Sequence, residues 1–320
     1  MRRIIVLLLA AVICVSFAGC GSDSGEVFFP TEPEETKGTP PDRGEMVILF
    51  TGGLEGVYAR EETQGILGYA ALAAYDDQLA EEDHKLILVD GGHSVASNAD
   101  DGLWDIVDSC SYDLRVPGAL EPSTGVQRLV NRADDLKTGT YVSCNLMDLK
   151  GDTTVFDPYV ILEVGEVKVG FVGVTQPQSL KPMDRNRYAL IGEENGQALY
   201  DVVQQAVDDA ANAGAEFVIV VSNLGTDPED TPCTAAEVMA NTTGFCVWLD
   251  SGSDSVLDGD TVTDKDDFEI PVCAPGSRFY YLGQITLNLN DGTAKVELVT
   301  DLEEENRTVY NMIQKLKDEE

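Results

Sequence analysis

The chain has 320 residues, and its 57 acidic residues against 21 basic ones give it a formal net charge of −36. A field of that sign repels phosphate polymers and anionic lipid heads, which excludes nucleic acid as an expected partner. The length is enough for one large hydrophobic core or two smaller ones.

The first 19 residues have the pattern of a secretory signal peptide. Arg2 and Arg3 precede an apolar run that ends at Phe17, and two small residues stand directly before Cys20. This pattern resembles a bacterial lipobox, with Phe17 where Leu is usual, and it predicts cleavage before Cys20 and a lipid on its thiol. The alternative is an ordinary signal peptide with an incidental cysteine.

The segments that follow predict a tethered domain. No later run reaches the ~18 apolar residues of a membrane-spanning helix, so we expect a chain that is lipid-anchored to a membrane from outside the cytoplasm. Residues 20–45 are polar and acidic with four prolines, and they predict a disordered tether. Beyond it we expect one domain over residues 46–303 and a terminal helix over residues 304–320.

From residue 46 the chain alternates apolar strands with amphipathic helices. The pattern predicts helices over residues 65–82, 124–136 and 196–214, strands over residues 46–51, 85–90, 140–148 and 215–222, and hairpins over residues 158–175 and 279–302. Continuous apolar strands separated by helices are typical of an α/β sheet that is covered on both faces.

The cysteines give no metal or redox motif. Cys14 leaves with the signal peptide, and no C-x-x-C pair occurs among the five that remain besides Cys20. These five allow a disulfide whose partners the sequence does not determine. They are Cys110, Cys144, Cys233, Cys246 and Cys273.

Ligands of such sheets gather where the strands end. The strand ends read, in chain order, FTGGLEG, VDGGHS, VPGALEPS, CNLMD, VVSNLG and WLDSGSDS. Together with the runs SYDLRVPGALE and VFDPYVILEVGEVKVGFVGVT, their order and spacing resemble the metallophosphoesterase domain of the secreted 5′-nucleotidase and cyclic-phosphodiesterase family. The resemblance runs from about residue 46 to residue 302. It implies a calcineurin-like fold, with two facing mixed sheets flanked by helices in a four-layer α/β/β/α sandwich.

The resemblance also implies where metal ligands and catalytic groups would stand. The family shows Asp-x-His, Gly-Asp, Gly-Asn-His-Glu, a lone His and Gly-His-x-His in successive loops. The first Asp and His correspond here to Gly53 and Glu55, the metal-bridging Asp to His93, the Asn and catalytic His to Ala119 and Leu120, the lone His to Asn223, and the last His pair to Ser253 and Ser255. Gly118 and Glu121 match the family.

These substitutions predict a lost metal centre. Two-metal phosphoryl chemistry needs a bridging carboxylate and several further ligands. A neutral imidazole at His93 cannot bridge two cations, Leu120 cannot protonate a leaving group, and Gly53 has no donor atom. A shift of the alignment by one residue cannot restore the set, because the chain has only two histidines. We therefore expect no cofactor.

Two weaker metal sites remain as alternatives. Glu55, His93 and Asp254 stand on loops that should converge and would form a single-metal site, unless they are polar residues at a solvated rim. The aspartate-rich run from residue 254 to residue 269 lacks the spacing of an EF-hand and is interpreted as a solvated loop rather than a calcium site.

The sequence therefore favours a membrane-anchored pseudo-phosphatase that binds an unidentified extracytoplasmic ligand or protein, or has a structural role, without catalysis. The alternative is a 5′-nucleotidase-like, metal-dependent phosphoester hydrolase with a rebuilt, weaker site. Nucleotidases of the family hold the base in a carboxyl-terminal domain, and the run ENRTVYNMIQKLKDEE resembles the helix that leads to it. We expect no such nucleotide-binding domain here.

Overall fold

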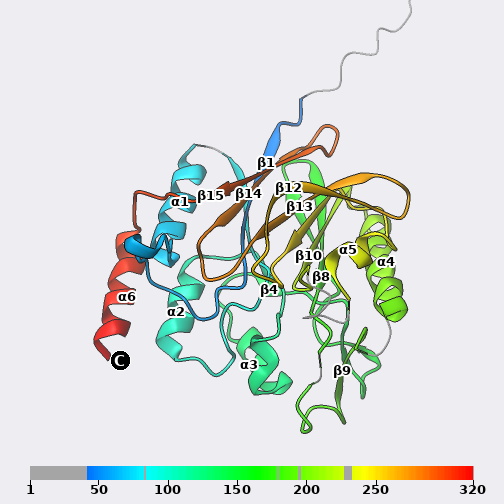
Figure 1. The fold of residues 1–320 in the computed structure, drawn as a ribbon, viewed down its shortest axis with the longest axis horizontal. Helices are drawn as coiled ribbons and strands as arrows, with labels where there is room; N and C mark the ends of the chain where they lie inside the picture. Colours follow the sequence, from blue (N-terminus) through cyan, green and yellow to red (C-terminus); the bar gives the residue numbers. More distant parts are fainter. Residues whose placement is uncertain (1–41, 83, 179, 194–195, 227–232, 320) are drawn as a thin grey trace, which may run out of the picture. The chain divides into compact units, whose positions relative to one another are not determined.

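The computed structural model describes residues 42–82, 84–178, 180–193, 196–226 and 233–319 (Figure 1). Residues 42–320 separate from residues 1–41 as a unit of their own. The predicted signal peptide, Cys20 and most of the predicted tether lie outside the described residues. No helix in the described ranges is long and apolar enough to cross a membrane.

The first sheet is built around one continuous apolar strand, β1, whose six residues after Glu45 are all buried. Such a strand belongs inside a covered sheet, and it pairs in parallel with β2 and antiparallel with β14. The sheet has the order β15 (Ala294–Val299), β14 (Leu282–Asn288), β1 (Glu45–Thr51), β2 (Lys85–Asp90), β3 (Leu114–Arg115) and β4 (Thr140–Tyr141).

The second sheet faces the first and holds the other apolar runs. Its strands β8, β10, β11 and β13 are parallel, and a hairpin strand closes each edge. The order is β12 (Val256–Thr263), β13 (Glu269–Pro275), β11 (Val247–Asp250), β10 (Phe217–Ser222), β8 (Val167–Val174) and β7 (Tyr159–Val164). A small third sheet has the order β6 (Thr153–Thr154), β5 (Leu146–Asp148) and β9 (Tyr188–Leu190).

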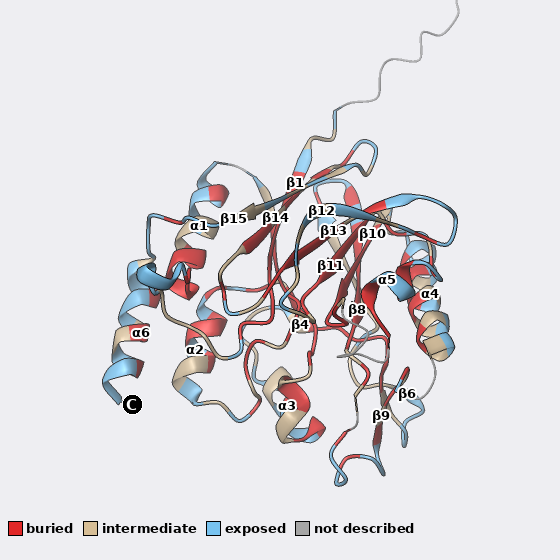
Figure 2. Cartoon of the chain, in the orientation of Figure 1, coloured by how far each residue is buried: buried red, intermediate tan, exposed pale blue. Residues whose placement is uncertain are grey.

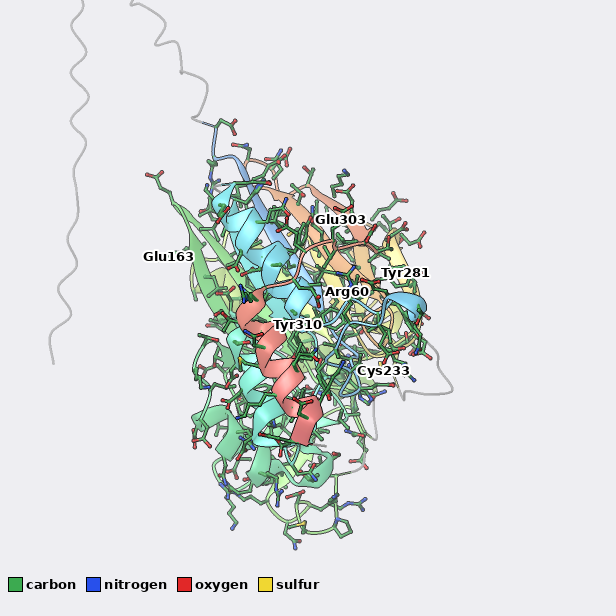
Figure 3. All side chains as sticks on the ribbon, turned by 90° about the vertical axis from the view of Figure 1, so that its left-hand side faces the viewer. Arg60, Glu163, Cys233, Tyr281, Glu303 and Tyr310 are labelled. Carbon is green, nitrogen blue, oxygen red and sulfur yellow. The ribbon has the colours of Figure 1, made fainter. Side chains whose placement is uncertain are left out.

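Helices cover the outer faces of both large sheets (Figure 1). On the first sheet α1 and α2 lie against the strands, and α6 packs across both helices (Figure 3). On the second sheet α4 and α5 lie against the strands. The helices are α1 (Tyr69–Glu81), α2 (Asp101–Ser109), α3 (Val126–Asp134), α4 (Gly196–Asn212), α5 (Ala235–Met239) and α6 (Arg307–Glu319), with short 3₁₀ turns η1 (Glu62–Gln64) and η2 (Glu121–Thr124).

Three large cores separate these layers, as the buried residues in Figure 2 show. One core lies between the two sheets, around Phe50 and Phe171. A second lies under α1, α2 and α6, around Leu72, and a third lies under α4 and α5, around Trp248. The predicted four-layer α/β/β/α arrangement is therefore confirmed.

Two predicted elements differ from the structure. The strand predicted over residues 140–148 breaks between β4 and β5, because the Asn145 side chain binds both the N–H and the C=O of Thr175 and turns the chain into the third sheet. Half of the loop predicted over residues 254–269 is strand β12, whose exposed and half-buried residues alternate along most of its length at the sheet edge. No disulfide joins any two of the five cysteines in the described ranges.

Candidate functional site

The candidate site lies where five parallel strands of the two sheets end. Loops follow β1, β2 and β3 in one sheet, and β10 and β11 in the other. The two groups of loops touch: the Ser251 hydroxyl after β11 donates to the carbonyl of Gly91 after β2 at 2.6 Å. The loops that carry the predicted site residues therefore meet at this edge.

The loops after β1 and β2 run alongside each other through backbone hydrogen bonds. The N–H groups of Gly53, Glu55 and Gly56 donate to the carbonyls of residues 92, 93 and 94 at 2.7–3.0 Å. Glu55 and His93 both have a left-handed backbone, with φ of 54° and 57°. That conformation persists in residues with a side chain only where surrounding contacts fix it, as this ladder does.

A buried carboxylate, Glu121, ties the loop after β3 to the loop after β2. One of its oxygens accepts the N–H groups of Ser94 and Val95 at 2.8 and 3.3 Å. The other accepts those of Gly118 and His93 at 2.7 and 3.1 Å. Burial raises the pKa of Glu121 above its ordinary value, and the backbone donors oppose that shift.

Asp250, at the end of β11, is a buried carboxylate that ties together the loops after β10 and β11 in the second sheet. It is 1% exposed. Its carboxylate accepts the Ser222 hydroxyl and the N–H groups of Leu224, Gly225 and Gly252 at 2.5–3.3 Å. We call Glu121 and Asp250 the clamp carboxylates. In the sequence, Glu121 stands out only as a match to the family, and Asp250 does not stand out, although an Asp that ends a buried apolar strand, as in VWLD, is a signal for such a role.

Ser251 fills the centre between the loops. A Cβ atom on Gly52 would lie 2.2 Å from the Cβ of Ser251, and one on Gly91 would lie 2.6 Å from its hydroxyl oxygen. The same hydroxyl accepts a hydrogen bond from the Asn223 amide at 2.9 Å. The side-chain oxygen of Asn223 faces Gly118, where an added Cβ would lie 2.7 Å away. Backbone and small side chains therefore occupy the middle of this edge.

The other predicted site residues lie around that centre. Glu55 and Asp254 are exposed, whereas His93, Ala119, Leu120, Ser253 and Ser255 are half-buried. Ser253 and Ser255 share the hydroxyl of Thr226 at 3.3 and 2.7 Å. Burial lowers the pKa of His93, and the negative charge of Glu55 opposes that shift.

A buried polar row supports the loops from below. Thr51, Asp90, Arg115 and Tyr141 are paired in register across β1 to β4. Burial, with a further contribution from Glu121, raises the pKa of Asp90 to about 6. Its oxygen accepts the Ser94 hydroxyl at 2.7 Å and the N–H of Gly92 at 3.0 Å.

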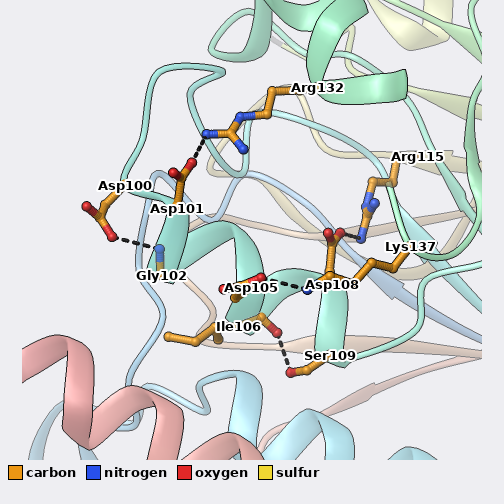
Figure 4. A network of polar contacts seen from close by, with 10 residues as sticks. All are labelled: Asp100, Asp101, Gly102, Asp105, Ile106, Asp108, Ser109, Arg115, Arg132 and Lys137. Carbon is orange, nitrogen blue, oxygen red and sulfur yellow. Dashed lines mark hydrogen bonds and ion pairs between the residues drawn. The ribbon is translucent and has the colours of Figure 1, made fainter. Parts of the chain in front are cut away.

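Arg115 joins this row to α2 (Figure 4). Its guanidinium is 1% exposed and donates to Asp108 at 3.2 Å. Two further ion pairs follow the same helix, Arg132 with Asp101 and Lys137 with Asp105. Acidic residues spaced along one side of α2 therefore meet a cation from β3, α3 or the loop after α3, which fixes the helix beside the site.

Comparison with known proteins agrees with this architecture, although no family model matches the chain. The 5′-nucleotidase precursor of Thermus thermophilus has a TM-score of 0.71 at 18% identity, covering 86% of this chain and 59% of that one. The calcineurin-like phosphoesterase YfkN from Bacillus subtilis has a TM-score of 0.68 at 16% identity, covering 87% and 98%. The fold is that of the calcineurin-like phosphoesterases.

A sequence relative points the same way. The chain is 23% identical over 245 residues to a 2′,3′-cyclic-nucleotide 2′-phosphodiesterase/3′-nucleotidase of Salmonella typhimurium, covering 69% of this chain and 37% of that protein. The calcineurin-like fold also carries a sulfate thiohydrolase, SoxB of T. thermophilus, with a TM-score of 0.71 at 17% identity. This chain thus spans little more than a third of the curated relative, and the fold by itself does not name a reaction.

The residues at this edge do not fit the metal centre that calcineurin-like phosphoesterases imply. Within the described ranges, no group of three or more His, Cys, Asp and Glu side chains is placed to hold a metal ion. Gly53 has a φ of 63°, and a Cβ there would lie 3.2 Å from the Gly276 carbonyl oxygen. Ser251 stands between Gly52 and Gly91, where a larger residue at either glycine would collide with it.

Proposed function

We propose that this chain is a surface-anchored extracytoplasmic lipoprotein whose calcineurin-like domain binds a ligand or protein, or has a structural role, without hydrolysing phosphate esters. The observation that carries the proposal is the packed centre of the site, where Ser251 lies between two glycines and contacts Asn223. Two-metal phosphoryl transfer needs ligands that place two cations around a reacting phosphate. Small neutral side chains in close contact do not supply them.

The charge at the site also supports a domain that is stable without cations. The positions Gly53, Ala119, Leu120 and Ser253 are neutral, so they carry no repulsion that a metal would have to offset. The two buried clamp carboxylates already have hydrogen-bond donors on both oxygens. These hydrogen bonds offset part of the cost of burying the two carboxylates.

The test is turnover by residues 21–320 on p-nitrophenyl phosphate, a nucleoside monophosphate and a cyclic nucleotide. We expect no hydrolysis with added Mn²⁺, Zn²⁺ or Ca²⁺. Metal-dependent turnover of about 1 s⁻¹ or more, ordinary for enzymes, would contradict the proposal.

A hydrolase with a rebuilt site is the second candidate. The observation in its favour is that Glu55 is close enough to influence the pKa of His93. If turnover is found, Glu55→Ala and His93→Ala should abolish it, while Asp254→Ala tests the third member of that set. Turnover that survives all three changes would place the reaction elsewhere.

The anchoring part of the proposal concerns Cys20, which lies outside the described residues. Cys20→Ser should move the protein from the membrane fraction to the soluble extracytoplasmic fraction. A single acyl chain holds a protein to a membrane only marginally, so stable retention implies two or more chains. A wild-type protein that is already soluble would contradict the lipid anchor.

A further inference from the structure

We propose that the turns around the third sheet form a weak contact with an anionic lipid surface. These turns, residues 148–152 and 180–187, are called the tip. They project at the end of the molecule opposite the β14–β15 turn (Figures 1 and 2). The inference does not depend on whether the calcineurin-like site is active.

The tip is one structural unit made of two turns. β5 pairs with β9 in register, from Leu146 with Leu190 to Asp148 with Tyr188. The N–H of Leu149 donates to the carbonyl of Arg187 at 2.7 Å, which joins the turn after β5 to the turn before β9. Side chains on both turns are therefore presented together.

Two large apolar side chains protrude from the tip. Met183 is 75% exposed and Leu149 is 53% exposed. The described chain has five exposed large hydrophobic residues, so two of the five stand on these short turns. An exposed apolar side chain gains nothing in water, but it is stabilised when it enters the boundary between headgroups and acyl chains.

The tip is also cationic in a strongly anionic protein. It holds four basic and three acidic residues, a net charge of +1 in a chain of −36. Two of its acids are already engaged: Asp148 pairs with Arg187 at 3.0 Å, and the buried Asp184 accepts the N–H of Val126 at 3.4 Å. The other basic side chains, Lys150, Lys181 and Arg185, are exposed and form no ion pair with a described residue.

Local charge decides how the tip meets a membrane, because charges more than about 8 Å away are largely screened at physiological ionic strength. Each Lys or Arg near an anionic surface strengthens binding roughly fivefold. Exposed Met and Leu beside unpaired lysines therefore match an anionic bilayer. A neutral bilayer would be bound by the apolar side chains only.

The first test reads insertion of the tip from a tryptophan placed on it. Residues 42–320 contain all the cores described above, so this unit can be studied without the lipid anchor. The native Trp104 and Trp248 are 4% and 0% exposed, which makes an added Trp the main reporter of the surface. In Met183→Trp we expect a blue shift, and quenching by brominated lipid, with phosphatidylglycerol-containing vesicles.

The matched control is Phe268→Trp, at a residue that is 64% exposed on the acidic β12–β13 turn. It should show neither change. Equal quenching of both tryptophans would overturn the proposal, as would the absence of quenching in Met183→Trp. Equal quenching in pure phosphatidylcholine vesicles would contradict the proposed preference for an anionic surface.

The second test measures how strongly the same vesicles retain the unit. Lys150→Gln with Lys181→Gln should weaken sedimentation with anionic vesicles about 25-fold, since two basic residues are removed. Lys315→Gln with Lys317→Gln, on α6, removes the same charge elsewhere and should leave binding unchanged. Equal weakening by both pairs would contradict a contact made by the tip. An unchanged melting temperature would show that each variant is folded.

Discussion

The clamp carboxylates and the family-aligned ligand positions stand at the same sheet edge, yet they differ in what they contact. Glu121 and Asp250 are buried, and both oxygens of each accept backbone N–H groups from neighbouring loops. Gly53, Ala119 and Leu120 contribute no polar side chain. The contacts that fix the course of these loops therefore come from the clamp carboxylates and from close packing rather than from the aligned positions.

The largest expected effect on stability is that of removing the Asp250 clamp carboxylate. Asp250→Ala should lower the free energy of unfolding by at least about 3 kcal/mol, because the N–H groups of Leu224, Gly225 and Gly252 lose an acceptor at ~1–3 kcal/mol each. Urea unfolding measures this, and the exposed Asp254→Ala should change stability by less than about 0.5 kcal/mol. A loss below about 1 kcal/mol for Asp250→Ala, the lower end for a single lost acceptor, would show that the loops do not need this clamp.

Packing at the centre gives the next largest effect. Gly52→Ala should cost about 1–3 kcal/mol, the usual range for overpacking, because its Cβ would overlap the Ser251 side chain. Adding Ser251→Gly should recover a large part of that loss, even though it removes the hydrogen bond to the Gly91 carbonyl. If the double variant is no more stable than Gly52→Ala alone, Ser251 is not what fills the centre.

Asp90, in the buried polar row beneath the loops, should make the stability of the protein depend on pH. The pKa of Asp90 is raised from 3.8 to about 6. The folded state therefore binds its proton more tightly than the unfolded chain does, so this stabilisation is complete below about pH 4 and is lost as the pH rises through about 6. Asp90→Asn removes that slope and keeps an oxygen that can accept the Ser94 hydroxyl.

The measurement is urea unfolding of both proteins from about pH 3 to about pH 8, a window that brackets both pKa values of Asp90. Relative to Asp90→Asn, the wild type should lose about 3 kcal/mol across that window, since its pKa rises from 3.8 to about 6 and one pKa unit corresponds to ~1.4 kcal/mol. The difference between the two curves isolates Asp90 from other carboxyls with a raised pKa, such as Asp76. A difference that stays constant with pH would contradict this assignment.

The smallest expected effect is that of metal ions on the aligned ligand positions. EDTA and millimolar Zn²⁺ or Mn²⁺ should leave the melting temperature within about a degree, whereas a metal at a hundredfold excess over its Kd would add about 2.7 kcal/mol. Ca²⁺ should do slightly more by screening the acidic surface. A saturable shift of several degrees that His93→Ala abolishes would reveal a rebuilt site.

Much of the fold follows from local patterns. The apolar run of β1 and the hairpin of β7 and β8 need no distant partner to be recognised, and the spacing of apolar residues in α4 predicts a helix in the same way. The segment of β12 is different. Its aspartates argue for a solvated loop, but pairing with β13 makes it an edge strand whose acidic side chains point to water. Charge in that segment indicates exposure, and exposure alone does not distinguish a loop from a sheet edge.

The sequence alone is enough for the α/β class, the order of the strand ends and the residue types at the family-aligned positions, because each depends on contiguous residues. Only the tertiary structure decided what fills the site. Ser251 and Gly91 are 160 residues apart along the chain, and Glu121 reaches back 27 residues to Ser94. Such contacts depend on how the loops and the two sheets pack together. The residue type of a serine or an aspartate does not indicate whether its side chain is exposed to water or buried in a packed centre.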